Sequence, residues 1–563
     1  METVIAKNLK IGDVLKEQGC LSEEQLQKAL ESQKKDKGKR LGEVLIEQGY
    51  ITERQMLEAM AAKTNCQMVN VRAIPIHMDA VAKIPRQVAE RYCILGTQIN
   101  GGRLQVIVND PLNFYALEDV RQITGMELDI LLCEREPLQK AIHLNYAEIT
   151  AKDAANKANA VLSKNVEEME VEEGDDDTPI INLLNSLIQR AYSAYASDIH
   201  IEPFEDKTNV RMRIDGTIVD YVTLRTSVHN SLIARIKILA ELDIAERRAP
   251  QDGHFKVKQP DGYLNIRVSV IPTVFGEKAV LRLLSNNARI DHPNTFGMVE
   301  EDYRKLQRML LSPNGIIYLT GPTGSGKTTT LYMILEELSR KSVNISTIED
   351  PVEKNLPRVN QMQVNPLAGL TFETGLRALL RQDPDIIMVG ETRDSETAAI
   401  SVRSALTGHL VFSTLHTNDA VSSAIRLKDM GLEPYLIANS MVGVVAQRLM
   451  RKVCGECARE QLLTKEEKQL LGLPEEVSFM VKKPCGCPVC NNTGYRGRIA
   501  IHEILMIDKE MRKMITESAS VEEMKQYAIR KQGMNTLKQS AIRYLKDGMT
   551  SVEEVVKVAY YEE

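Results

Sequence analysis

A glycine-rich segment in the second half of the chain has the residue types that bind phosphate. GPTGSGKTT follows the apolar run GIIYLT and fits the pattern G-x-x-x-x-G-K-[ST]. Glycines let backbone amides wrap a phosphate, Lys327 would bridge the β- and γ-phosphates, and the Thr328 hydroxyl would ligate Mg²⁺. The expected contacts are Gly321, Pro322, Thr323, Gly324, Ser325, Gly326, Lys327, Thr328 and Thr329. This spacing predicts an ATP site rather than a plain strand–helix turn.

Three acidic residues follow the next apolar run, in ISTIEDPVE. They are Glu349, Asp350 and Glu353. Carboxylates at the carboxyl end of a parallel strand beside a phosphate loop can orient water or Mg²⁺. The alternative is a solvated acidic loop.

Two further apolar runs carry candidate catalytic residues. DPDIIMVGETRD resembles a Walker B strand, except that Gly390 stands where an Mg²⁺-binding Asp is usual. Glu391 is then the predicted general base for the attacking water. HLVFSTLH has His409 and His416 at its two ends, and one of them could sense the γ-phosphate. His416, at the carboxyl end, is the better candidate, and a structural role is the alternative for both.

Two Cys-x-x-Cys pairs near the end of the chain have the spacing of a metal site. The predicted ligands are Cys454, Cys457, Cys487 and Cys490. Four thiolates leave no open position, so a structural Zn²⁺ is expected rather than a catalytic one. Cys485 is a fifth thiol that could compete with Cys487 for the metal.

Composition limits the classes of function. A net charge of −6 and a pI near 6.0 disfavour a nucleic-acid translocase, which needs basic surface against phosphate. No apolar run reaches the roughly 18 residues that cross a bilayer, and the first residues lack a signal-peptide pattern. The expected location is therefore the cytoplasm, with any membrane association through a partner.

With 563 residues the chain is too long for one core, and its pattern indicates several regions. KIGDVLKEQGCLSEEQLQKAL, from Lys10, is repeated as RLGEVLIEQGYITERQMLEAM, from Arg40, and each copy predicts a helical hairpin. The run NVEEMEVEEGDDDT predicts a linker, because its carboxylates repel one another. The expected regions are 1–63 (helical repeat), 64–150 (small α+β unit), 151–178 (acidic flexible linker), 179–287 (α+β domain) and 288–563 (doubly wound α/β domain, with a zinc subdomain at 453–498).

Several motifs in this order resemble one family along almost the whole chain. They are ASDIHIEP, RAPQDG, FGEKAVLRLL, GPTGSGKTTTLY, EDPVE, LRQDPDIIMVGETRD, TGHLVFSTLHTNDA and CGCPVCNNTGYRGR. Together they resemble the type IV pilus assembly and type II secretion ATPases (PilB/GspE-like). The resemblance implies an α/β multidomain protein: a RecA-like ATPase domain preceded by a PAS-like α+β domain and an α-helical plus α+β N-terminal region. It also implies a homohexamer that works with an inner-membrane platform protein.

The resemblance also implies roles for particular residues. Arg213, Arg267 and Arg282 match the positions from which the preceding domain brings arginines to the phosphates. The acids at 349–353 match the family's aspartate box, and the glycine before Glu391 is a family trait. The long N-terminal region and the cysteine pairs favour assembly or secretion over pilus retraction.

The N-terminal repeat resembles the cyclic di-GMP-binding domain of some members. The matching residues are Lys10, Gly12, Arg40, Leu41 and Gly42, with lysine in the first copy where arginine is usual. A helical docking module for a membrane partner is the alternative. For the whole chain, the rival interpretations are a DNA-uptake or conjugative translocation ATPase and a non-hydrolysing regulator.

Overall fold

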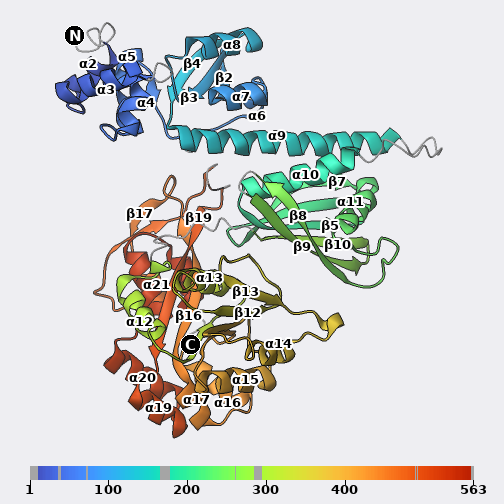
Figure 1. The fold of residues 1–563 in the computed structure, drawn as a ribbon. Coiled ribbons are helices and arrows are strands. Elements are labelled where there is room, and N and C mark those ends of the chain that lie inside the picture. Colours follow the sequence, from blue (N-terminus) through green and yellow to red (C-terminus); the bar gives the residue numbers. More distant parts are fainter. Residues whose placement is uncertain are drawn as a thin grey trace. The chain divides into compact units, whose positions relative to one another are not determined.

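The computed structural model describes residues 10–35, 40–71, 74–164, 178–259, 262–284, 295–487, 490 and 492–559. The chain forms two compact units, Met1–Leu283 and Leu284–Glu563, which are described separately (Figure 1). In the described residues, no helix combines the length and the apolar character that a membrane span requires.

The first unit begins with two helical hairpins, as the repeat predicts. The helices are α2 (Ile11–Glu17), α3 (Glu23–Lys35), α4 (Leu41–Glu47) and α5 (Glu53–Thr64). The hydroxyls of Ser22 and Thr52 accept N–H groups of the following turn at 3.2 and 3.3 Å, which caps α3 and α5. Gly19 and Gly49 take left-handed φ values of 72° and 70°, which glycine adopts without strain, so both turns are alike.

A small α+β part follows, with a four-stranded sheet in the order β1-β4-β3-β2. Its elements are β1 (Gln67–Met68), α6 (Met78–Val81), α7 (Arg86–Tyr92), β2 (Ile94–Asn100), β3 (Arg103–Val108), α8 (Phe114–Thr124) and β4 (Glu127–Leu132). Apolar residues from its strands and helices form one buried cluster.

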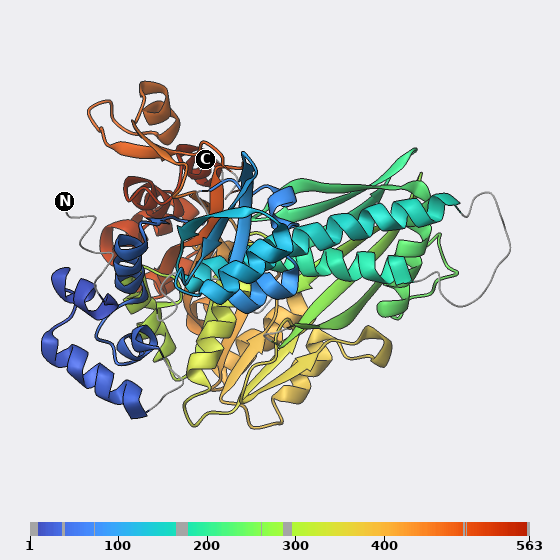
Figure 2. The same ribbon diagram turned by 90° about the horizontal axis from the view of Figure 1, so that it is seen from above.

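The helix α9 (Arg135–Lys164) runs through the predicted start of the linker. Ala154, Ala155 and Ala158 are at most 8% exposed and share a core with α10 (Thr178–Ser193), so α9 and α10 pack side by side (Figure 2). The prediction of a linker is therefore wrong for 151–164, because these alanines are buried in a helix. Residues 165–177, with the acidic run, lie outside the described residues.

A six-stranded antiparallel sheet completes the first unit, in the order β7-β6-β5-β10-β9-β8. The strands are β5 (Ala196–Pro203), β6 (Lys207–Ile214), β7 (Thr217–Arg225), β8 (Gln251–Gln259), β9 (Gly262–Thr273) and β10 (Gly276–Leu284). Helices α10 and α11 (Thr226–Leu239) contribute to the same apolar core as the strands.

The second unit is built on a seven-stranded sheet in the order β13-β12-β14-β15-β11-β16-β19. The strands are β11 (Gly315–Thr320), β12 (Ile345–Glu349), β13 (Val359–Gln363), β14 (Ile386–Val389), β15 (Leu410–Leu415), β16 (Met441–Val453) and β19 (Tyr495–Met506). All neighbours pair in parallel except β16 and β19. The carboxyl ends of the parallel strands therefore meet at one edge, where ligands bind in open α/β sheets.

Helices cover both faces of this sheet, as predicted for a doubly wound domain. Along β11, Ile316 and Tyr318 belong to one apolar cluster and Ile317 and Leu319 to another, and all four are 0% exposed. The helices are α12 (Glu300–Leu310), α13 (Lys327–Leu338), α14 (Phe372–Leu379), α15 (Ser395–Leu406), α16 (Ser422–Asp429) and α17 (Pro434–Ser440).

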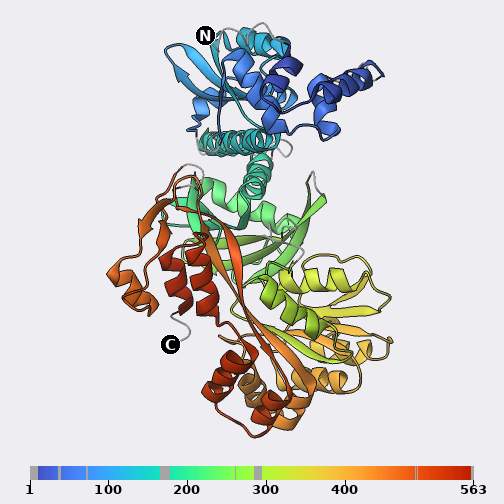
Figure 3. The same cartoon turned by 90° about the vertical axis from the view of Figure 1, so that its left-hand side faces the viewer.

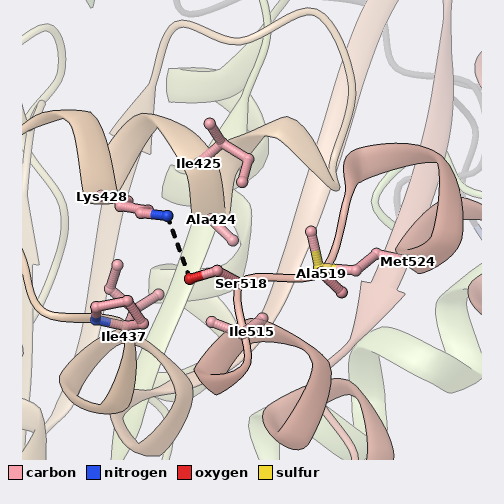
Figure 4. A pocket seen from close by; sticks show the side chains of 9 residues that line it. Ala424, Ile425, Lys428, Ile437, Ile515, Ser518, Ala519 and Met524 are labelled. Carbon is pink, nitrogen blue, oxygen red and sulfur yellow. Dashed lines mark hydrogen bonds between the residues drawn. The ribbon is translucent and has the colours of Figure 1, made fainter.

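A small insert and four helices complete the chain. The insert holds β17 (Arg459–Leu462), α18 (Lys465–Leu471) and β18 (Met480–Lys483), and the helices are α19 (Lys509–Thr516), α20 (Val521–Gln532), α21 (Leu537–Lys546) and α22 (Val552–Ala559). Figure 3 shows the last helices beside the β16–β19 pair. Between α16–α17 and α19–α20 lies a small, mostly apolar pocket, across which Lys428 Nζ donates to Ser518 Oγ at 3.2 Å (Figure 4).

Candidate active site

The phosphate loop connects the buried strand β11 to α13. Gly321, Gly324 and Gly326 have φ values of 143°, 79° and 88°, which only glycine adopts readily. The loop thereby turns back on itself and begins α13 at Lys327. Five of the predicted contact residues are exposed: Pro322, Thr323, Gly324, Thr328 and Thr329. An anion can therefore reach both the loop and the helix N-terminus.

Lys327 is held inside this loop. Its Nζ donates to the carbonyl oxygens of Gly321 and Pro322 at 2.7 and 3.1 Å, and the residue is 8% exposed. Burial lowers the pKa of Lys327 to about 8, Glu391 opposes this shift and Arg448 adds to it. The ammonium is thus poorly solvated and bound only by neutral carbonyls, so a phosphate would be a stronger partner.

Glu391 and His416 lie together at the carboxyl edge, after β14 and β15. His416 Nε2 is 3.8 Å from Glu391 Oε2, and the Arg393 guanidinium is 2.6 Å from Glu391 Oε1. Burial, and then the charge of Lys327, lower the pKa of His416, so the imidazole is mainly neutral at pH 7. The Glu391 side chain is 14% exposed, so it can reach water at this edge. The predicted base, one predicted histidine and the loop lysine are therefore brought together.

Gly390 explains the missing aspartate of the Walker B strand. A Cβ at this position would lie 3.3 Å from both Glu349 Cα and the Ile348 carbonyl oxygen, closer than ordinary contacts. The Gly390 N–H donates to that same carbonyl at 2.8 Å. The end of β12 thus packs closely against this position, and a side chain here would require it to shift by a few tenths of an ångström.

The three acids at 349–353 are in different environments. Glu349 is 3% exposed and accepts hydrogen bonds from Tyr332 Oη, Thr347 Oγ1 and Gln361 Nε2, the last two at 2.6 and 3.0 Å. Its carboxylate therefore already has hydrogen-bond partners within the protein. Asp350 is exposed at the same edge, and the Glu353 N–H donates to Tyr332 Oη at 3.0 Å.

Tyr332 on α13 is a residue that motif reasoning missed. Its hydroxyl connects Glu349 and Glu353 to the helix that begins at the phosphate loop. Burial raises the pKa of this phenol, so it stays protonated and donates to Glu349. The only sequence signal is its position on the first turns of that helix.

His409 lies at the opposite end of β15 from His416. Its Nδ1 is 2.9 Å from the Ser404 carbonyl oxygen, and its own carbonyl accepts the N–H of Gly315, where β11 begins. The structure therefore does not bring His409 together with the phosphate loop in this chain.

Two of the three predicted arginines share one partner in the first unit. Asp198 pairs across the sheet with Arg213 on one side and Arg282 on the other, so all three side chains lie on one face. Arg282 Nε donates to the buried Asp198 carboxylate at 2.9 Å, and Arg213 Nε is 3.6 Å from it. Arg267 lies on β9, next to β10 in the same sheet.

The candidate dinucleotide residues begin equivalent helices. Lys10 and Arg40 are the exposed N-cap residues of α2 and α4, and Arg40 also forms an ion pair with Asp110. Both glycines also lie close to core side chains, since a Cβ at Gly12 would lie 2.8 Å from Leu26 Cδ1 and one at Gly42 2.7 Å from the Met56 methyl. Leu41 is half-buried beside the core of the hairpins.

The four predicted metal-binding cysteines form one cluster. Their sulfurs all lie within 4.8 Å of one another. The pairs Cys454–Cys487 and Cys457–Cys490 are each 3.9 Å apart. A tetrahedral ion about 2.3 Å from each sulfur needs sulfur–sulfur distances of about 3.8 Å, so the group fits Zn²⁺. Cys485 is exposed and outside this cluster, which removes it as a competitor.

Comparisons with known proteins agree with this arrangement. Residues 173–557 match the family described as "Type II/IV secretion system protein", and residues 64–151 match the "MshEN domain". The type IV pilus assembly ATPase PilB of Myxococcus xanthus is 38% identical over 558 residues, which cover 97% of this chain and 98% of that protein. The type II secretion system ATPase E of Vibrio cholerae is 43% identical over 392 residues, covering 69% and 76%.

A solved structure supports the fold alone. The ATPase DotB of Legionella pneumophila aligns with a TM-score of 0.52 at 21% identity, covering 70% of this chain and 98% of that one. The parallel sheet and the phosphate loop are those of a RecA-like ATPase domain. The chain belongs to the type II/IV secretion system protein family, and it is an ATPase.

Proposed function

We propose that this ATPase powers the assembly of a type IV pilus. The observation that carries the proposal is the extent of the match to the Myxococcus xanthus pilus assembly ATPase, which includes the N-terminal region as well as the motor. The match to the Vibrio cholerae secretion ATPase covers a smaller part of this chain. Assembly of a secretion pseudopilus is therefore the second candidate.

The site residues have distinct roles in the proposed hydrolysis. The ammonium of Lys327 would leave the loop carbonyls for the β- and γ-phosphates, and the exposed Thr328 hydroxyl would be a ligand for Mg²⁺. When bound, Mg²⁺ neutralises charge on the phosphates. Glu391 takes a proton from the attacking water, while His416, mostly neutral beside it, can donate to the γ-phosphate.

The arginines of the first unit would complete the charge neutralisation. Arg213 and Arg282 share Asp198, which fixes both guanidinium groups on one face. In a homohexamer, these two arginines and Arg267 would neutralise charge that develops on the γ-phosphate. The ring would work in the cytoplasm against an inner-membrane platform protein. A role in moving nucleic acid is not expected for an acidic chain.

A strain lacking the gene tests the cellular role. Wild-type protein should restore surface pili, and the Lys327→Ala variant should not, because it loses its contact with the phosphates. Pili are counted by electron microscopy, and exported enzymes are assayed in the same cultures. Restored export without pili would instead favour the secretion candidate.

Phosphate release from purified protein should not require DNA, and strict DNA dependence would contradict the proposal.

We propose further that the N-terminal hairpins bind cyclic di-GMP. Lys10 and Arg40 are exposed cations at equivalent positions, which suits a ligand with two equivalent phosphates. Titration of the full chain should show binding, and Lys10→Ala/Arg40→Ala should lose it. Lys28→Ala, an exposed cation in the same hairpins, is the matched control. Absence of binding to wild-type protein would leave the docking-module alternative.

A further inference from the structure

Gln447 of β16 packs directly against the phosphate loop, although no motif singles it out. The residue is 1% exposed. Its Nε2 donates to the Ser325 carbonyl oxygen at 2.9 Å, and its Oε1 accepts from Thr330 Oγ1 at 2.9 Å. One buried amide thus joins the loop to the first turn of α13. Each polar end has a hydrogen-bond partner there, which offsets the cost of burying it.

Two loop glycines rest against this residue. A Cβ at Gly321 would collide with the Gln447 backbone oxygen, and one at Gly326 would lie 2.8 Å from Gln447 Nε2. The left-handed φ values already favour glycine at both positions. Because Gln447 lies close to both glycines, β16 supports the loop at both of its ends.

We infer that Gln447 is a positioning residue for nucleotide binding. In a planar trans peptide, the carbonyl and the following N–H point in opposite directions. Because Gln447 binds the Ser325 carbonyl, it turns the N–H of Gly326 away from β16, where that N–H can donate to a phosphate. The hydrogen bond with Thr330 holds the start of α13 in register with the loop. This inference rests on nucleotide binding at the loop, and it adds a residue to that site.

The first test replaces the amide by an apolar side chain of similar size. Gln447→Met should raise the Kd for ATP and ADP by about tenfold, because the Ser325 carbonyl loses its donor. At saturating ATP, kcat should stay within about threefold of wild type. The reason is that the loop should bind the phosphates equally well in the ground state and the transition state. Thr330→Val removes the partner hydroxyl and should raise Kd in the same direction by less.

A second variant gives a signature that simple loss of packing cannot produce. In Gln447→Glu, an ionised carboxylate offers no donor to Ser325, whereas a protonated one does. Burial raises the pKa of a carboxyl, so this group should titrate near neutrality. The ratio of the variant's Kd to the wild-type Kd should therefore fall as pH is lowered from 8 to 6. Lys327 and His416 titrate in both proteins, so the ratio isolates position 447. For Gln447→Met the ratio should not change.

Two controls separate the possible failures. Gln532→Met removes another amide of the same unit, whose Nε2 donates to Met506 O and Asp508 Oδ2 at 2.9 Å, and should leave Kd unchanged. Lys327→Ala tests the nucleotide site itself. If Lys327→Ala abolishes binding but Gln447→Met binds like wild type, the inference is wrong while the site stands. If Lys327→Ala binds normally, the proposed site is wrong. A pH-independent Kd ratio for Gln447→Glu would also overturn the inference.

Discussion

Glu391→Gln should bind ATP with near-wild-type affinity and lose turnover by about 10²- to 10⁴-fold, the usual contribution of a general base. The amide keeps the size of the side chain and the neighbouring His416 and Arg393, but it cannot accept a proton from water. Binding is measured by titration with a fluorescent ATP analogue, and turnover by phosphate release under saturating Mg²⁺ and ATP.

Glu396→Gln, on the exposed surface of α15, is the matched control and should hydrolyse ATP normally. Substantial turnover by Glu391→Gln would show that another group activates the water. Asp350, exposed at the same edge of the sheet, would then be the next residue to replace.

Cys487→Ser should lose the bound metal and unfold the insert. Structural Zn²⁺ contributes about 10–16 kcal/mol of binding free energy in small zinc domains, and this insert has little apolar core of its own. Burial also raises the pKa of Cys454 well above its usual range, so that sulfur needs a cation to become a thiolate. Metal content by mass spectrometry should fall from about one Zn²⁺ per chain to nearly none, with faster hydrogen exchange over 454–487.

Cys485→Ser is a stringent control because it removes a thiol only two positions away. Cys485 is exposed and outside the sulfur cluster, so this variant should keep its metal and its exchange protection. Equal loss of metal from both variants would mean that Cys485 is a ligand.

The sequence predicted those parts of the site whose residues are close along the chain. Gly321 to Thr328 form one continuous segment that ends in the first residues of α13, and Glu391 comes two residues after β14, so spacing was sufficient to predict their positions. Gln447 and Tyr332 escaped prediction because their partners, Ser325 and Glu349, are brought to them only by folding. Neither residue belongs to a pattern with a known chemistry. The preference for His416 over His409 came from its position at the carboxyl end of the strand, and folding adds that His409 Nδ1 lies 2.9 Å from the Ser404 carbonyl oxygen.

The same limit explains why 151–164 in the first unit was predicted to be a linker. The run 151–164 is rich in alanine and lysine, and the acidic residues that follow made the whole stretch resemble a linker. Ala155 and Ala158 become core residues only because they pack against α10 in the folded chain. Gly12 and Gly42 stay predicted ligand contacts, and folding adds that each also lies close to a core side chain, Leu26 or Met56.

The β16–β19 pair has a consequence for self-association. One edge of β16 pairs with β19, and the other edge pairs with β11 only as far as Ala446. Beyond Ala446, the backbone groups on that other edge are not paired with β11. The final helices close this edge, because Arg451 N–H donates to Glu554 at 2.8 Å and Val453 N–H to the Met549 carbonyl at 3.0 Å. An uncovered edge is a template for intermolecular β-pairing. We therefore expect the segment that contains the last two helices to hinder pairing of this edge with a strand of another molecule.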